Sequence, residues 1–280
     1  MLLGDCLNHL NTMPKASVEF SVFSPPFLNL YSYTASERDL GNQKTREDFF
    51  NLFDQMVRLL LNVMKPGRIA ACHVAQVPMT LVDHGEIGLR DFRGWTIAAF
   101  IRAGWVHHGE VVIDKDPQAQ AIRTKTKGLL FVQLRKDSSW LRPALADFLL
   151  LFRKPGDNAE AIHGDITNDE WIKFAHPIWY DIDETDVLSG REAREEKDEK
   201  HICPLQLGLI DRAVRLWSNP GDVVLSPFAG IGSEGYQSIL RGRNFVGIEL
   251  KRSYYEQACR NLATANTKAN EGDLFAVGVA

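Results

Sequence analysis

The sequence lacks any run of about 20 apolar residues, the length that a membrane-spanning helix needs. Cysteines are few and far apart, at Cys6, Cys72, Cys203 and Cys259, and none forms a Cys-x-x-Cys pair. This spacing argues against a disulfide framework and against a zinc site, so we expect a reducing, cytoplasmic setting. The N-terminus has no basic run ahead of an apolar one, so no secretory signal is expected. Hydrophobic residues still make up 45% of the 280, enough for one large domain, or for one domain with an insertion.

An excess of positive charge is also lacking: the formal net charge is −4, and this total does not indicate a nucleic-acid-binding protein. The distribution is uneven, however. Residues 114–154 contain nine Lys or Arg and four Asp or Glu, a sum of +5, whereas residues 155–200 contain five and fourteen, a sum of −9. Such runs can be two solvated surfaces. The basic segment is nevertheless the candidate for contacts with phosphate groups.

Short apolar runs alternate with helical patterns in the first and last parts of the chain, which predicts an α/β fold with a parallel sheet covered on both faces. The strand expected at 18–23 must end there, because Pro25 and Pro26 cannot continue a sheet ladder. Apolar residues at steps of three and four predict a helix over 46–64, closed by a turn at 65–67. Further strands are expected at 68–74, 111–113, 148–152, 223–226 and 244–249, and further helices at 95–103, 205–217, 233–241 and 253–265.

The segment most informative about function is Ser226-Pro227-Phe228-Ala229-Gly230-Ile231-Gly232-Ser233, a loop between an expected strand and an expected helix. Glycines let the backbone pass close to a ligand that the helix N-terminus faces. About twenty residues on, the next strand ends at Glu249, which can accept hydrogen bonds from both ribose hydroxyls of a nucleoside. A tight turn with an incidental glutamate is the alternative. The order strand, loop, helix, strand and acid favours a nucleoside cofactor.

Two motifs together resemble a known family. The loop is similar to the FxGxG element of the DNA amino-methyltransferases, which use S-adenosylmethionine, and Ser24-Pro25-Pro26-Phe27 is similar to their (Asp/Asn/Ser)-Pro-Pro-aromatic tetrapeptide. The acidic turn at Gly4-Asp5 resembles the one that contacts the cofactor adenine. The resemblance therefore implies a catalytic site at residues 24–27. It implies cofactor contacts from Asp5, Phe228, Gly230, Gly232 and Glu249.

The order of the motifs resembles the permuted β group of this family, with the tetrapeptide first and the cofactor loop last. This implies a Rossmann-like methyltransferase fold with a mixed, mostly parallel sheet and a circularly permuted motif order. The expected division is a catalytic half over 1–113, a target-recognition insert over 114–200 and a cofactor-binding half over 201–280. Residues 201–206 depart from the family's His-Pro-x-x-Lys-Pro, which leaves open their contacts to the methionine part of the cofactor.

The tetrapeptide suits methylation of an amino group. The exocyclic nitrogen of cytosine or adenine is a poor nucleophile, because its lone pair is delocalised into the ring. Ser24 and the carbonyl of Pro25 can accept its hydrogens and direct the lone pair at the sulfonium methyl, in a geometry that the prolines hold rigid. The ring of Phe27 can stack on the base after it leaves the duplex.

The identity of the base is left open between two possibilities. A serine at the first position is more usual in the family's N4-cytosine enzymes, which slightly favours N4 of cytosine; N6 of adenine is the alternative. Methylation at carbon-5 of cytosine is disfavoured, because that reaction needs a Pro-Cys pair and this chain has Cys203 ahead of Pro204. His107 and His108 have no third ligand at a useful spacing, so no metal is expected.

Double-stranded DNA is the expected partner, and a second copy of the chain and a cognate restriction nuclease are further candidates. Contacts to DNA phosphates are expected from the basic segment, at Arg123, Lys125, Lys127, Arg135 and Lys136. Two rival hypotheses differ in kind. A methyltransferase acting on RNA or on a protein glutamine is disfavoured by the permuted order and the long insert, and a non-catalytic nucleic-acid-binding module is disfavoured by the intact glycines and Glu249.

Overall fold

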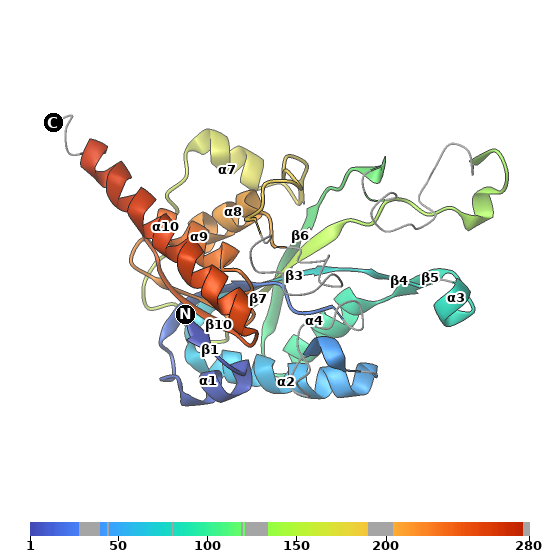
Figure 1. Ribbon diagram of the computed structural model, residues 1–280, viewed down its shortest axis with the longest axis horizontal. Helices are drawn as coiled ribbons and strands as arrows, with labels where there is room; N and C mark the ends of the chain where they lie inside the picture. Colours follow the sequence, from blue (N-terminus) through green and yellow to red (C-terminus); the bar gives the residue numbers. More distant parts are fainter. Residues whose placement is uncertain are drawn as a thin grey trace.

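A computed structural model of the chain describes residues 1–27, 40–43, 45–79, 81–118, 120, 134–189 and 204–276 (Figure 1). Within these residues the main sheet has eight strands. Their order across the sheet is β1 (Leu2–Leu3), β10 (Asn244–Glu249), β9 (Val223–Ser226), β2 (Val18–Phe23), β3 (Met64–Ala75), β7 (Asp147–Arg153), β6 (Val106–Ile113) and β8 (Ile178–Trp179). Only β7 among them runs antiparallel to its neighbours, so the expected mixed, mostly parallel sheet is confirmed.

Helices cover both faces of this sheet (Figure 1). The first layer contains α1 (Cys6–Thr12), α2 (Arg46–Val63) and α4 (Phe92–Arg102), and the second contains α8 (Leu207–Trp217), α9 (Ser233–Leu240) and α10 (Arg252–Ala276). The alternation of side chains along a strand explains both layers. On β2, Phe23 packs among the aromatic side chains of the first layer, whereas Phe20 and Val22 pack against α8.

Smaller elements lie outside these layers. A two-stranded hairpin of β4 (Val77–Met79) and β5 (Gly88–Arg90) projects from the end of β3, with α3 (Leu81–His84) at its tip (Figure 1). The helix α7 (Asn168–Phe174) begins with a capping box, in which Thr167 and Glu170 bond reciprocally. Two 3-10 turns are η1 (Leu40–Asn42) and η2 (Ser138–Trp140). None of the helices in the described ranges is long and apolar enough to cross a membrane.

The pairing of β2 with β9 brings together the two motifs singled out in the sequence. These strands are parallel, with Phe20 opposite Val224 and Ser21 opposite Leu225. The buried Ser21 hydroxyl also donates to the carbonyl of Leu225 at 2.9 Å. Parallel neighbours end at the same edge of a sheet, and ligands of such folds bind beyond that edge. The tetrapeptide after β2 therefore lies beside the loop after β9.

One local expectation differs from the structure. Residues 65–67 do not form a separate turn after α2, because β3 begins directly at Met64 and includes them. Gly67 has φ +73° and donates its N–H to the carbonyl of Lys154, so the irregularity is a bulge within the sheet. Residues 114–200 contribute β7 to the middle of the sheet and β8 to its edge. The division of the chain into two halves and an insert stays a prediction.

Candidate active site

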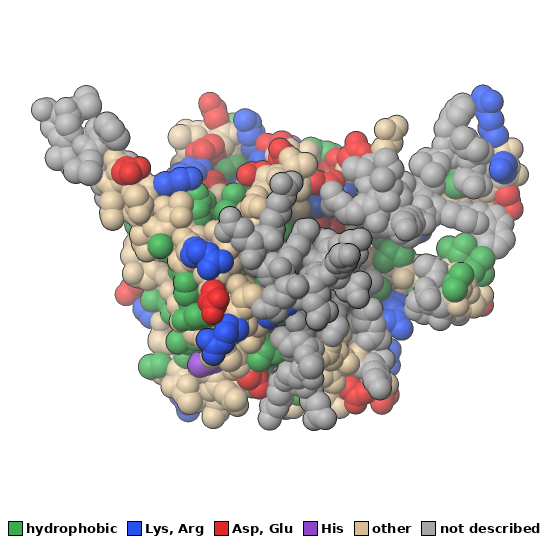
Figure 2. Space-filling model, in the orientation of Figure 1, with side chains coloured by type: hydrophobic (Ala, Val, Ile, Leu, Met, Phe, Trp, Pro, Cys, Tyr) green, Lys and Arg blue, Asp and Glu red, His purple; other side chains and the backbone are tan. Residues whose placement is uncertain are grey.

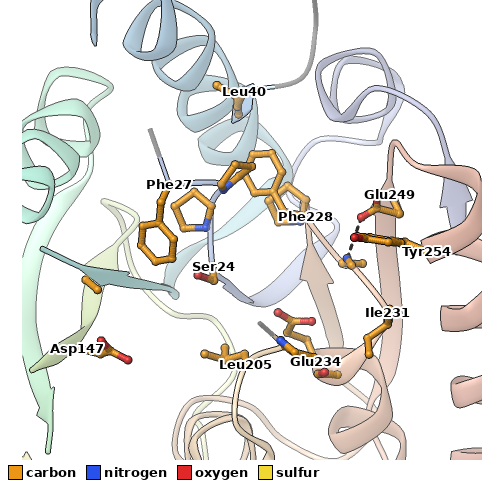
Figure 3. Close-up of a pocket in the computed structure, with 18 of the residues that line it drawn as sticks. Ser24, Phe27, Leu40, Asp147, Leu205, Phe228, Ile231, Glu234, Glu249 and Tyr254 are labelled. Atoms are coloured by element: carbon orange, nitrogen blue, oxygen red, sulfur yellow. Dashed lines mark hydrogen bonds between the residues drawn. The ribbon is translucent and has the colours of Figure 1, made fainter. Parts of the chain in front are cut away.

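A cavity of about 330 Å³ opens at the carboxyl ends of β2 and β9, and both motifs line it (Figure 3). The tetrapeptide 24–27 forms one part of the wall, and the loop residues Phe228 and Gly230 form another. The rings of Phe23 and Phe228 lie 5.8 Å apart, centroid to centroid, so the two chain segments are in contact. A volume of this size suits a small organic ligand.

Glu249 fixes the conformation of the glycine loop. Its Oε2 accepts the N–H of Gly230 at 2.9 Å, and its Oε1 accepts the N–H of Lys251 at 2.8 Å. A carboxylate oxygen has two lone pairs, so it can accept more than one hydrogen bond. Gly230 has φ +52°, and a Cβ added to it would meet no atom of the described structure within 4 Å, which leaves that side of the loop open to a ligand.

Gly232 occupies a different position from Gly230. It does not line the cavity. A Cβ there would lie 2.8 Å from Leu262 Cδ1 and 3.3 Å from Ala258 Cα, both on α10, and its φ is +87°. The second glycine of the loop therefore packs closely against α10, and it lies between Ile231 and Ser233, which do line the cavity.

Asp5 lies on the wall of the cavity, next to the strand that ends in Glu249. It is the N-cap of α1, and its Oδ1 accepts the N–H of Leu7 at 2.9 Å. The preceding Gly4 donates its N–H to the carbonyl of Glu249 at 2.9 Å, which holds the turn against β10. The two acidic residues expected on the nucleoside part of the cofactor thus lie on one side of the cavity.

The catalytic tetrapeptide contacts a group of polar side chains that the sequence did not reveal. The Oγ of Ser24 lies 3.2 Å from Nδ1 of His73, on β3. The Nε2 of the same ring lies 3.2 Å from Oδ2 of Asp147, the first residue of β7. Lys115 is buried, and its Nζ lies 2.8 Å from that carboxylate oxygen. Serine, histidine and aspartate therefore form one continuous chain of hydrogen bonds.

The charge of Asp147 determines which atom donates in each of these hydrogen bonds. Burial raises the pKa of Asp147, but its hydrogen bond from His73 and the charges of His73 and Lys115 outweigh burial and hold that pKa below its ordinary value. An ionised carboxylate only accepts, so Nε2 of His73 must donate to it. In the neutral ring Nδ1 then carries the lone pair and can accept the hydroxyl proton of Ser24.

Phe27 forms an apolar wall of the cavity. Its ring meets the ring of Phe92 edge to face, with centroids 5.6 Å apart. Phe92 is fully buried at the start of α4, so it restricts where the Phe27 ring can lie. A ring held in this way can form a stacking platform at little cost in conformational entropy.

Sequence reasoning missed His73, Lys115, Asp147 and Glu234, all of which line or adjoin the cavity. A weak signal existed for His73, because it is a polar residue within the apolar strand 68–74. For Asp147 and Lys115 no local pattern in the sequence points to the site. Asp147 begins β7, which becomes a neighbour of β3 only in the folded sheet, and Lys115 follows β6, which lies on the other side of β7.

The cavity fits S-adenosylmethionine, the cofactor implied by the sequence resemblance. Gly230 leaves open space beside the loop, and Glu249 presents acceptors for a ribose. Ser233 lines the cavity, is 2% exposed, and its Oγ has no hydrogen-bond partner in the described structure. A buried hydroxyl without a partner is costly, and a polar ligand group would remove that cost.

The expected DNA-contacting residues are only partly described. Arg135 and Lys136 are exposed and belong to the segment 134–142, which lies on the right of Figure 1, away from the helices that cover the sheet. Figure 2 shows Lys and Arg side chains at the end of the molecule where this segment lies. Arg123, Lys125 and Lys127 lie outside the described residues.

Comparison with known proteins gives consistent matches. A family model for N6/N4 methyltransferases, described as DNA methylase, matches residues 18–260. The chain is 31% identical over 290 residues to Type II methyltransferase M.HinfI of Haemophilus influenzae, a match that covers 100% of this chain and 72% of that protein. It is 29% identical over 320 residues to Type II methyltransferase M.BglI of Bacillus subtilis, covering 96% and 86%. The solved structure of a DNA modification methylase from Thermus thermophilus in complex with S-adenosyl-L-methionine matches with a TM-score of 0.69 at 22% identity, covering 94% of each chain.

Proposed function

The chain belongs to the DNA methylase family, and from this premise we propose that it transfers a methyl group to N4 of a cytosine flipped out of double-stranded DNA. Family membership confirms the resemblance drawn from the sequence, the Rossmann-like methyltransferase fold and S-adenosylmethionine as the cofactor. It also supports amino-methylation of DNA in general. The choice of cytosine over adenine is our inference from the site.

The observation that carries the proposal is the hydrogen-bonded chain from Ser24 through His73 to Asp147. S-adenosylmethionine supplies a methyl group on a positively charged sulfur. Ser24 Oγ and the carbonyl of Pro25 accept the two hydrogens of the target amino group and so orient its lone pair toward the methyl. Pro25 has no N–H, so this residue offers no donor that could compete with the amino group for these acceptors.

The same chain of side chains can remove the proton that the reaction sets free. When the bond from nitrogen to methyl forms and the bond from sulfur to methyl breaks, the nitrogen carries one hydrogen too many. Ser24 accepts that proton as it passes its own to Nδ1 of His73. Asp147 stabilises the resulting imidazolium, as the buried carboxylate does in a Ser-His-Asp triad.

The residue at the first position of the tetrapeptide favours cytosine over adenine. The family members that act on adenine usually place an aspartate or asparagine at the first position, so a carboxylate or amide meets the amino group directly. Here a neutral hydroxyl takes that position, and a histidine and a carboxylate behind it supply the base. A serine at the first position is the variant more usual in the family's N4-cytosine enzymes.

The DNA contacts complete the proposal. Residues 114–200 form the target-recognition insert, and Arg135 and Lys136, which are exposed, contact phosphate groups there. Phe27 stacks on the flipped base, which offsets part of the few kcal/mol that unstacking requires. A homodimer, a cognate restriction nuclease and a cytoplasmic location stay predictions from the sequence.

The decisive experiment identifies the product. The protein is incubated with genomic DNA and S-adenosylmethionine, and the DNA is then digested to nucleosides and analysed by mass spectrometry. We expect N4-methylcytosine. Finding N6-methyladenine alone would replace our choice of base with the alternative.

The matched control for this assay is Ser24→Ala. We expect it to yield at most about a hundredth of the wild-type product, because the amino group loses an acceptor and its path to His73. Its affinity for S-adenosylmethionine, measured by calorimetry, should stay within roughly twofold of wild type. No binding of the cofactor by the wild-type protein would instead favour a non-catalytic scaffold.

A further inference from the structure

Glu234 lies in the same cavity but takes no part in the chemistry described above. It is the second residue of α9, only 4% of its surface is exposed, and it lines the cavity. Figure 3 shows its carboxyl group reaching from the start of α9 into the cavity, with Leu205 beside it. Within the described structure, its own backbone N–H is the one hydrogen-bond donor that acts on this carboxyl group. A carboxyl group that is so deeply buried and so poorly partnered requires an explanation.

The charges around Glu234 indicate what it would bind. The other acidic residues on the cavity wall are Asp5, Asp147, Glu184 and Glu249. Lys115 is the one basic side chain among the described lining residues, and it is paired with Asp147 at 2.8 Å. The cavity therefore has an excess of negative groups, and a cationic ligand would complement it.

S-adenosylmethionine carries two positive groups, the sulfonium and the α-ammonium of its methionine part. The sulfonium has no N–H or O–H to donate, whereas the ammonium has three N–H donors. Glu249 and Gly230 mark the ribose position and Ser24 marks the reacting centre. Glu234 and the unpartnered Ser233 hydroxyl line the same cavity at the start of α9, so they would hold the methionine part.

We propose, on the basis of the proposed function, that Glu234 recognises the α-ammonium of the cofactor's methionine part as a carboxylate, and that it releases its own proton to solvent when the cofactor binds. The ammonium arrives already charged, so the pair that forms is a charge-assisted hydrogen bond. The deprotonation balances because the proton leaves to buffer and the carboxylate gains the ammonium as its partner.

The protonation of Glu234 in the free protein agrees with this role. Burial raises the pKa of Glu234 to about 8, the backbone N–H lowers it in part, and the nearby charge of Glu249 raises it further. The elements packed against α9 are α8, α10, β9 and β10, and Glu249 at the end of β10 is the charged group among them that acts on this pKa. At pH 7 about nine-tenths of the carboxyl groups are then neutral before the cofactor binds.

Calorimetry in buffers of different ionisation enthalpy tests the proposal. Wild-type protein is titrated at pH 7 with S-adenosylmethionine, and the dependence of the heat on the buffer gives the number of protons released. We expect close to one proton per cofactor for wild type and close to none for Glu234→Gln. We also expect Glu234→Gln to bind the cofactor about 10- to 100-fold more weakly, the range for loss of a charge-assisted hydrogen bond.

A truncated ligand provides the matched control. 5′-Methylthioadenosine keeps the adenosine part and lacks both the ammonium and the carboxylate, so Glu234→Gln and wild type should bind it equally well. Wild-type binding of S-adenosylmethionine without proton release would overturn this inference and leave the proposed function intact. In that case Glu234 would stay protonated and donate to the methionine carboxylate. Equal weakening of both ligands by Glu234→Gln would point to damage of the cavity and would also contradict the proposal.

Discussion

A serine hydroxyl is by itself a weak base, and the surroundings of Ser24 determine what it can do. Its Oγ lies 3.2 Å from His73 Nδ1 and 3.3 Å from the carbonyl of the same residue. Donation to the ring leaves the hydroxyl lone pairs free to face the target amino group. Because Asp147 fixes the tautomer of the ring from the opposite side, the function of Ser24 depends on a residue that it does not touch.

Substitution of Asp147 by asparagine tests this dependence. The amide can present its NH2 group to Nε2 of His73, which favours the tautomer with the proton on Nδ1, and Nδ1 then cannot accept from Ser24. We expect kcat to fall about 10²- to 10⁴-fold while the Kd for S-adenosylmethionine changes by less than about threefold. Single-turnover kinetics and calorimetry measure the two quantities. An unchanged kcat in a protein that unfolds at the wild-type temperature would show that the relay does not operate.

Some residues of the site could be predicted from the sequence, and others could not. The tetrapeptide could be identified because its prolines end the strand before it, and Glu249 because it ends the strand that comes after the glycine loop and its helix. His73 and Asp147 could not be paired, since they lie 74 positions apart on strands that become antiparallel neighbours only in the sheet. Gly232 was assigned to the cofactor by motif alone, and the structure places it against α10.

Among the helices and strands, those bounded by prolines or by a turn had the most accurately predicted ends. The strand 18–23 and the strand 223–226 have the bounds expected, because Pro25-Pro26 ends the first and the turn at 219–222 precedes the second. The last helix was expected to end near residue 265 but continues to Ala276. Beyond Ala265 the side chains that the structure describes are mostly exposed, so this part of the helix carries no apolar periodicity from which it could be predicted.

A buried ion pair joins the elements that carry the two halves of the site. Arg68, at the start of β3, is 1% exposed and donates from Nη1 to Oδ2 of Asp222, just before β9, at 3.0 Å. The same oxygen accepts the N–H of Asn219 at 2.8 Å, which holds the turn before β9. The contact links the strand that carries His73 to the strand that leads into the cofactor loop.

Removing one partner of this pair should destabilise the protein strongly. Asp222→Ala leaves the Arg68 guanidinium buried without its close carboxylate, and we expect the free energy of unfolding to fall by about 3–5 kcal/mol. The matched control is Asp54→Ala, which breaks the bond to the half-exposed Arg102 and should cost at most about 1 kcal/mol. Urea denaturation measures both. Similar small losses for the two variants would show that the buried pair does not join the halves.

At the scale of the whole molecule, the stability of the free protein should reflect the acidic character of its cavity. A site built for a cationic ligand holds negative groups close together, and they destabilise one another until the ligand arrives. Burial and the charge of Glu249 raise the pKa of Glu234, whereas the partners of Asp147 lower the pKa of that residue despite its burial. The two carboxyl groups should therefore affect folding in opposite directions and in separate ranges of pH.

The signs follow from proton binding. Asp147 contributes stability at pH values above its ordinary pKa of 3.8, and this contribution is lost as the pH falls through the lower pKa of the folded state. Glu234 has a folded-state pKa of about 8 against an ordinary value of 4.5, so between these values the folded protein binds more protons than the unfolded chain. Its contribution to the free energy of unfolding must then decrease as the pH rises, by at most about 1.4 kcal/mol per pH unit.

We therefore expect Glu234→Gln to be increasingly more stable than wild type as the pH rises from 5 to 8, with a difference of about 4 kcal/mol at pH 8 in the absence of cofactor. Urea denaturation at several pH values measures this difference directly. Saturating S-adenosylmethionine should reduce it or reverse its sign, because the ammonium then compensates the carboxylate of the wild-type protein. Parallel pH profiles for the two proteins would mean that the Glu234 carboxyl group is solvated in the free cavity, since only a desolvated carboxyl group links folding to pH in this range.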